Sequence, residues 1–175
     1  YVDRLVLGVL KPDLTIQYGW TNSGYGDVTG YFQIFYGVGF LAFGWLIDRI
    51  GPRAGYLLAM SMWTVGHFAQ TLVTSTTGFV IARIPLALGE AGTFPSALAA
   101  ASQWFPKKER ALAIGIFNAG ANVGAIVTPL LVSYIVAVLL FDWRWAFIIT
   151  GLFNLVWLYF WWKYYRKPAE HPKLD

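Results

Sequence analysis

The chain alternates between long apolar stretches and short polar connections. A helix needs about 20 mainly apolar residues to cross the hydrocarbon core of a bilayer. Six stretches approach or exceed that length, and we place them at 1–16, 28–47, 54–73, 78–101, 111–139 and 145–162. Small residues such as Gly37, Gly44 and Gly120 recur inside them, as expected where helices approach closely in lipid. The pattern therefore predicts an all-α membrane protein with six transmembrane helices.

The first apolar stretch begins directly at Tyr1, without an initiator methionine and without the basic region and cleavage site of a signal peptide. We expect this stretch to be the later part of a truncated first helix. On this interpretation residues 1–167 form the helical bundle and residues 168–175 begin a cytoplasmic connection.

Composition supports lipid as the solvent. The chain is 57% hydrophobic and 13% charged, whereas a soluble domain carries about 25% charged residues. Cysteine is absent and there are two histidines, so we expect no disulfide, no metal site and no cofactor. The net charge of +4 does not indicate nucleic-acid binding, because the basic residues are spread over the connections.

The basic residues of the connections predict an orientation. Nine of them follow the second, fourth and sixth stretches, and the opposite connections contain Lys11 and Arg144. Loops rich in Lys and Arg stay in the cytoplasm. The 2–3 loop, the 4–5 loop and the C-terminal tail are therefore expected on the cytoplasmic side of a bacterial inner membrane. The nine residues are Arg49, Arg53, Lys107, Lys108, Arg110, Lys163, Arg166, Lys167 and Lys173.

Apart from Lys11 and Asp13 near the end of the first stretch, four charged residues fall inside the predicted spans: Asp3, Arg4, Arg83 and Glu90. Charges within the hydrocarbon region are costly, so they usually face a cavity and mark a transport pathway. The alternative is a set of salt bridges that only hold helices together. Arg83 and Glu90 are seven residues apart, which puts them on one helix face about 10 Å apart. A carboxylate in such surroundings takes up a proton more readily than in water, so Glu90 is a candidate for proton coupling.

The connection after the second stretch reads GWLIDRIGPR. Glycine at its start allows a close helix approach, and the second glycine permits a tight turn. The aspartate near a helix end can accept hydrogen bonds from a neighbouring helix or from arginine. The pattern G-x-L-x-D-R-x-G-x-R resembles the signature loop of the major facilitator superfamily, where it acts as a conformational latch. The resemblance implies that role for Gly44, Asp48, Arg49, Gly51 and Arg53.

The fourth and fifth stretches make the resemblance more specific. The segments RIPLALGEAGTFPS and WFPKKERALAIGIFNAGANVGA, with the exit YYRKPAEHPKL, are similar to the anion:cation symporter family. Within it the chain resembles bacterial hexuronate transporters and their galactonate-transporting relatives. The resemblance implies a six-helix N-terminal bundle, with the second, C-terminal bundle outside this chain.

The resemblance also implies roles for single residues. In the family the arginine of a Y-x-D-R motif binds the substrate carboxylate, which here is Arg4, and the aspartate is a possible second proton site. The span-four glutamate is the main proton site and the preceding arginine is its partner. Tyr36 either faces the cavity or packs, and Asn118 and Asn122 either face the cavity or bond across helices. The implied substrate-binding set is Arg4, Tyr1, Tyr36, Asn118 and Asn122, and the proton-coupling set is Glu90, Asp3 and Arg83.

Two further polar residues are weaker candidates for the transport site. Gln33 resembles the asparagines and is a weaker candidate, and His67 is interpreted as a packing or interfacial residue. No phosphate-binding loop, dinucleotide motif or nucleophile elbow occurs, so the sequence does not indicate an enzyme.

The functional hypothesis is proton-coupled symport of an organic anion, such as a hexuronate or another sugar acid, by alternating access. The expected partners are the anion, protons, the lipid bilayer and the second bundle. One alternative is a facilitator or antiporter of another organic anion. Another is a sensor or scaffold that keeps the fold without transport, which the four retained charges argue against.

Overall fold

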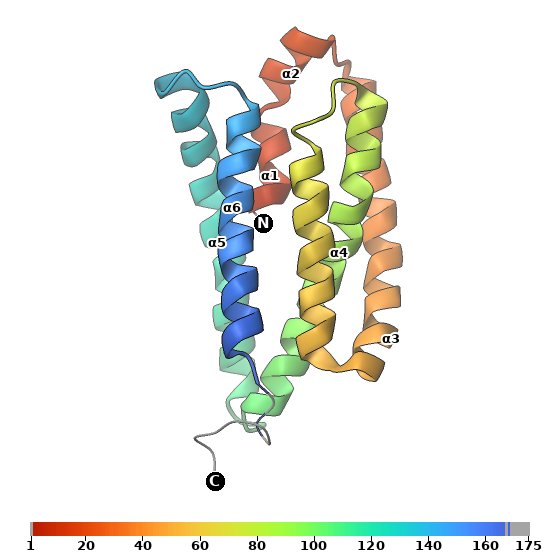
Figure 1. The fold of residues 1–175 in the computed structure, drawn as a ribbon, viewed down its shortest axis with the longest axis vertical. Coiled ribbons are helices and arrows are strands. Elements are labelled where there is room, and N and C mark those ends of the chain that lie inside the picture. Colours follow the sequence, from red (N-terminus) through yellow and green to blue (C-terminus); the bar gives the residue numbers. More distant parts are fainter. Residues whose placement is uncertain (1, 167, 169–175) are drawn as a thin grey trace.

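The computed structural model describes residues 2–166 and residue 168, and within them every regular element is a helix. The helices lie side by side in an elongated bundle, and α1 begins partway along its length (Figure 1). The elements are α1 (Val2–Val9), α2 (Lys11–Tyr18), α3 (Asn22–Ala69), α4 (Thr76–Trp104), α5 (Arg110–Ser133), the π-helix η1 (Tyr134–Val138) and α6 (Arg144–Tyr164).

The long helix α3 is a hairpin of two antiparallel arms (Figure 1). It breaks at Gly51, whose backbone has φ 79° and ψ 164°. That conformation is essentially restricted to glycine, and Pro52 follows at the start of the second arm, where proline is tolerated. The sequence places this break at the turn of the GWLIDRIGPR connection. The predicted stretches 28–47 and 54–73 occupy the two arms, although the second arm ends at Ala69.

The first predicted stretch, 1–16, is not one continuous helix. It is divided between α1 and α2, and α2 lies at an angle to α1 at one end of the bundle (Figure 1). Pro12 stands in the first turn of α2, where its missing N–H is tolerated but would interrupt a continuous helix. Gly19, with φ 64°, closes α2 through a hydrogen bond from its N–H to the Thr15 carbonyl.

In the described part of the chain, three segments are long and apolar enough to cross a membrane: α3, the continuous stretch Arg110–Val138, and α6. The fourth predicted stretch, 78–101, lies in α4, which is 29 residues long but contains the charged residues Arg83 and Glu90. Both charged side chains point into the bundle and are buried there.

The bundle buries several charged side chains and exposes many large apolar ones. Large apolar side chains are exposed along α3, α5 and α6, including Leu41 at 79% and Leu130 at 69%. Asp3, Arg83 and Glu90 are at most 6% exposed. This is the reverse of a water-soluble protein and fits a bundle whose outer surface contacts lipid.

Two glycines bring α3 and α4 into close contact. A Cβ atom at Gly66 would collide with the backbone of Leu86, and one at Gly89 would collide with the backbone of Ala59 and Trp63. The second arm of α3 therefore lies directly against α4 without side chains between them, as in other close helix pairs in membranes. This contact fixes the face of α4 that carries the buried charges.

Replacement of Gly89 by alanine should destabilise the bundle, because the added methyl group would overlap backbone atoms that cannot move independently. Overpacking of this kind costs about 1–3 kcal/mol. Thermal unfolding of the purified protein would measure the loss. Gly37→Ala is the control, because a Cβ atom there meets nothing within 4 Å. Equal melting temperatures for the two variants would contradict the proposed close contact.

Candidate transport site

The predicted in-span charges converge from two helices. α1 supplies Asp3 and Arg4, and α4 supplies Arg83 and Glu90. The Arg4 Nη1 atom lies 3.6 Å from the Glu90 Oε1 atom, with the arginine 26% and the glutamate 6% exposed. Opposite charges at this separation offset part of the desolvation cost of each other. The two residues form an ion pair in the centre of the bundle.

An aromatic ring on α3 holds both arginines. The Arg4 guanidinium carbon lies 5.1 Å from the centre of the Phe32 ring, and that of Arg83 lies 4.7 Å from it. Tyr36, one turn further along α3, stacks on Phe32 and contacts the Arg4 guanidinium at 5.4 Å. Cations over aromatic faces are stabilised where water is excluded. The sequence does not predict a role for Phe32 at this site, because aromatic residues are common in apolar stretches.

A small cavity opens beside the two arginines. Its volume is about 160 Å³. The first arm of α3 contributes a polar stripe to it at intervals of four residues, formed by Tyr25, Thr29 and Gln33. Two cationic groups with hydroxyl and amide groups nearby suit a carboxylate that carries hydroxyls. The lining residues are Arg4, Leu5, Gly8, Tyr25, Thr29, Phe32, Gln33 and Arg83.

Asp3 faces a different set of neighbours. It accepts a short hydrogen bond from the Asn154 side-chain amide of α6, and its other oxygen lies 3.3 Å from the His67 Nε2 atom. His67 is fully buried and also lies 2.8 Å from the Thr150 hydroxyl. Asp3 does not line the cavity beside Arg4. The sequence predicts a packing or interfacial role for His67 and does not reveal its polar contacts with Asp3 and Thr150, which come from distant parts of the chain.

The remaining predicted binding residues lie apart. Asn118 and Asn122 are exposed on α5 and line neither of the two pockets described here. Tyr1 lies outside the described residues. The described bundle therefore brings together Arg4, Tyr36, Arg83 and Glu90, whereas Asp3 contacts other residues and the two asparagines are exposed.

The predicted latch residues surround the turn of α3. Arg53 donates a hydrogen bond to the Trp162 carbonyl at 3.0 Å and so joins the second arm to the end of α6. The Arg49 guanidinium stacks on Trp45 at 3.8 Å. Asp48 is exposed, and a Cβ atom at Gly44 would meet nothing within 4 Å. The first-arm side of this turn is thus open to a neighbour outside the described residues.

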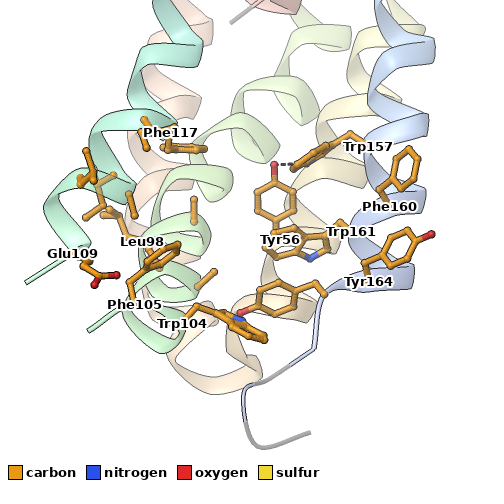
Figure 2. Close-up of a pocket in the computed structure, with 18 residues that line it drawn as sticks. Tyr56, Leu98, Trp104, Phe105, Glu109, Phe117, Trp157, Phe160, Trp161 and Tyr164 are labelled. Carbon is orange, nitrogen blue, oxygen red and sulfur yellow. Dashed lines mark hydrogen bonds between the residues drawn. The ribbon is translucent and has the colours of Figure 1, made fainter. Parts of the chain in front are cut away.

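A larger pocket of about 750 Å³ lies at the end of the bundle where α6 ends (Figure 2). Aromatic and aliphatic side chains line it, and Glu109 is the single charged residue among them. Figure 2 shows Tyr56 in its wall, where it accepts a hydrogen bond from the Trp157 indole at 2.9 Å. With no cation in its lining this pocket is unsuited to an organic anion, so the smaller cavity is the better candidate site. No group of three or more metal-ligating side chains occurs in residues 2–166 or at 168.

Comparison with known proteins identifies the family. A model of the Major Facilitator Superfamily matches residues 1–175. The chain belongs to the major facilitator superfamily. It is 31% identical over 175 residues to the "Galacturonate transporter" of Dickeya chrysanthemi, covering 100% of this chain and 50% of that protein. It is 34% identical over 169 residues to the "D-galactonate transporter" of an Escherichia coli O6:H1 strain, covering 96% and 39%.

A third relative is the "Hexuronate transporter" of Escherichia coli K12, 31% identical over 174 residues, with 99% of this chain and 40% of the relative covered. The chain spans half or less of the length of these relatives. Among solved structures, an inward-facing, occupied bacterial homologue of the human lysosomal transporter Spinster matches with a TM-score of 0.83 and 23% identity over 95% of this chain and 41% of that one. The predicted family and all-α fold are confirmed, as is the match to the N-terminal half of such transporters. The relatives are named as transporters, in agreement with a non-enzymatic protein.

The Arg4–Glu90 contact can be measured without a substrate. Arg4→Met should destabilise the protein by leaving the buried Glu90 carboxylate unpaired, and adding Glu90→Gln should recover part of the loss. The coupling energy between two contacting groups is typically about 0.5–3 kcal/mol. Melting temperatures of both single variants and the double variant form the cycle. Strictly additive effects would show that the two groups do not interact.

Proposed function

We propose that this bundle is one half of a two-bundle carrier that takes up a sugar acid together with protons. The observation that carries the proposal is the pair of arginines on one small cavity, one of them ion-paired with a buried carboxylate. Similarity to transporters named for galacturonate, hexuronate and galactonate supports a sugar acid as the substrate class. The second bundle would supply the other wall of the site.

Competition for Arg4 provides a coupling mechanism. When Glu90 is deprotonated it occupies the guanidinium, and the two charges cancel. When Glu90 takes up a proton, Arg4 is released and can bind the substrate carboxylate through its planar donor fork. Arg83, held on the same Phe32 ring, adds positive potential to the cavity. Substrate and proton therefore stabilise the same loaded state.

Alternating access would carry the loaded site across the membrane. In this fold class substrate sites lie near the bilayer midplane, and the two bundles rock around them. The break at Gly51 and the open side of the first arm at Gly44 suit a sliding contact with the second bundle at the cytoplasmic face. Asn118 and Asn122 on exposed α5 would then face the second bundle and could complete the site from that side. By the positive-inside rule, the basic loops would lie on the cytoplasmic side of a bacterial inner membrane.

Two other functions compete. A facilitator or antiporter of another organic anion would use the same arginines without net proton movement, and a sensor would bind without transport. Uptake of a radiolabelled sugar-acid panel, with and without an imposed proton gradient, separates the three. Accumulation that depends on the gradient supports symport, and saturable exchange without it indicates the first alternative. The absence of all uptake despite measurable binding indicates the second.

The Glu90→Gln variant should lose pH-driven accumulation and retain binding and exchange. Glutamine mimics the protonated glutamate, so Arg4 remains available to substrate but no proton is carried. Uptake against a gradient and counterflow in vesicles would be measured side by side. Glu109→Gln, an exposed substitution on the connection between α4 and α5, is the control and should behave as wild type. Full pH-driven accumulation by Glu90→Gln would overturn the coupling role.

The Arg4→Lys variant should raise the KM for the sugar acid by about tenfold, equivalent to about 1.4 kcal/mol. Lysine keeps the charge but cannot offer two parallel hydrogen bonds to a carboxylate. Initial rates of uptake over a range of substrate concentrations give the value. Arg166→Lys, at the end of α6, should leave KM unaltered. A KM for Arg4→Lys equal to that of wild type would exclude Arg4 from the carboxylate contact.

A further inference from the structure

His67, Thr150, Asn154 and Asp3 form a buried polar cluster outside the cavity. It joins three helices, since His67 lies on the second arm of α3, Thr150 and Asn154 on α6, and Asp3 on α1. His67 is 0%, Thr150 2% and Asp3 3% exposed. The cost of burying such groups is offset only if each polar atom finds a partner.

The hydrogen bonds assign the tautomer of His67. The Thr150 hydroxyl lies 2.8 Å from the Ala146 carbonyl, to which it donates its single proton. The same oxygen lies 2.8 Å from His67 Nε2 and has lone pairs free to accept. Asp3 Oδ1 lies 3.3 Å from the same nitrogen, so the tautomer with its proton on Nε2 suits both neighbours. A neutral imidazole satisfies both contacts.

The ring has little freedom to turn away. It packs against Phe147, with 5.3 Å between ring centres. Gly151 leaves the space beside it, because a Cβ atom there would lie 3.1 Å from His67 Cδ2 and 2.7 Å from Phe68. The N–H of His67 is thus held toward α1 by the shape of its surroundings.

From this arrangement we propose that His67 is a positioning residue for the anion site, acting through Asp3. One Asp3 oxygen accepts a hydrogen bond from Asn154, and the other lies 3.3 Å from His67 Nε2, so both oxygens face a nitrogen of a neighbouring helix. This fixes the depth and rotation of α1, a helix of only eight residues. We call these two contacts to Asp3 the clamp. Because Arg4 is the next residue, the clamp determines where the Arg4 guanidinium lies between Glu90 and the cavity.

The clamp also gives Asp3 a role different from that of Glu90. Asp3 contacts His67 and Asn154, whereas Glu90 contacts Arg4. The transport part of this inference rests on the proposed function, and the tautomer part does not.

Replacement of His67 tests the proposal by transport. Glutamine places an N–H donor near the position of Nε2 and cannot titrate, whereas leucine supplies no donor. His67→Leu should raise the KM for the sugar acid by about tenfold or more, with a smaller change in maximal rate per transporter in the membrane. His67→Gln should restore KM to within about threefold of wild type and keep its pH profile. Asn154→Leu should resemble His67→Leu.

Two results of the transport experiment would overturn the proposal. A KM for His67→Leu equal to that of wild type would show that Arg4 does not depend on the clamp. A shifted pH profile for His67→Gln would show that His67 itself titrates, which is a different role.

A second measurement does not depend on transport. In the complete protein labelled with ¹⁵N-histidine, the spectrum should show His67 protonated at Nε2 and bare at Nδ1 at neutral pH. The signal that disappears in His67→Gln is assigned to His67. Asp3→Asn should perturb the Nε2 signal. Protonation at Nδ1, or an imidazolium at neutral pH, would contradict the clamp even in a protein that transports no sugar acid.

Discussion

The cost of placing charge inside a lipid-facing bundle governs this structure. Asp3, Arg4, Arg83 and Glu90 bring two positive and two negative groups into the interior, and none of them could be buried alone. Arg4 pairs with Glu90, and Arg83 lies against Phe32. Asp3 accepts a hydrogen bond from Asn154 on α6 and lies 3.3 Å from His67 on α3. Each contact crosses between helices, so the polar groups that make the site also hold α1 in place.

The backbone geometry serves the same constraint. Gly66 and Gly89 let α3 and α4 approach until their backbones meet, which leaves the charged face of α4 directed at α1. Apolar side chains can then be left to the outer surface, where lipid solvates them. Close backbone packing and clusters of buried apolar side chains thus surround the charged groups.

Sequence was informative where a single local rule decides the outcome. Apolar run lengths predicted the helices in α3, α4, α5 and α6, and glycine chemistry placed the break at Gly51. The charged residues were evident because charge is rare in such stretches. The prediction failed for the first stretch, where Pro12 and Gly19 delimit a separate short helix. His67, Asn154 and Phe32 could not be ranked, because their importance comes from neighbours more than 25 residues away in sequence.

The adjacency of Asp3 and Arg4 shows why these roles need a helix. In an extended chain two opposite charges side by side would bring little specificity. On a helix consecutive residues point about 100° apart and do not face each other. Asp3 is directed at His67 and Asn154, while Arg4 is directed at Glu90 and the cavity. The acid therefore cannot neutralise the base next to it, and the base remains available to the glutamate on α4. The dipeptide thus separates one charge, which contacts α3 and α6, from another, which contacts α4 and the cavity.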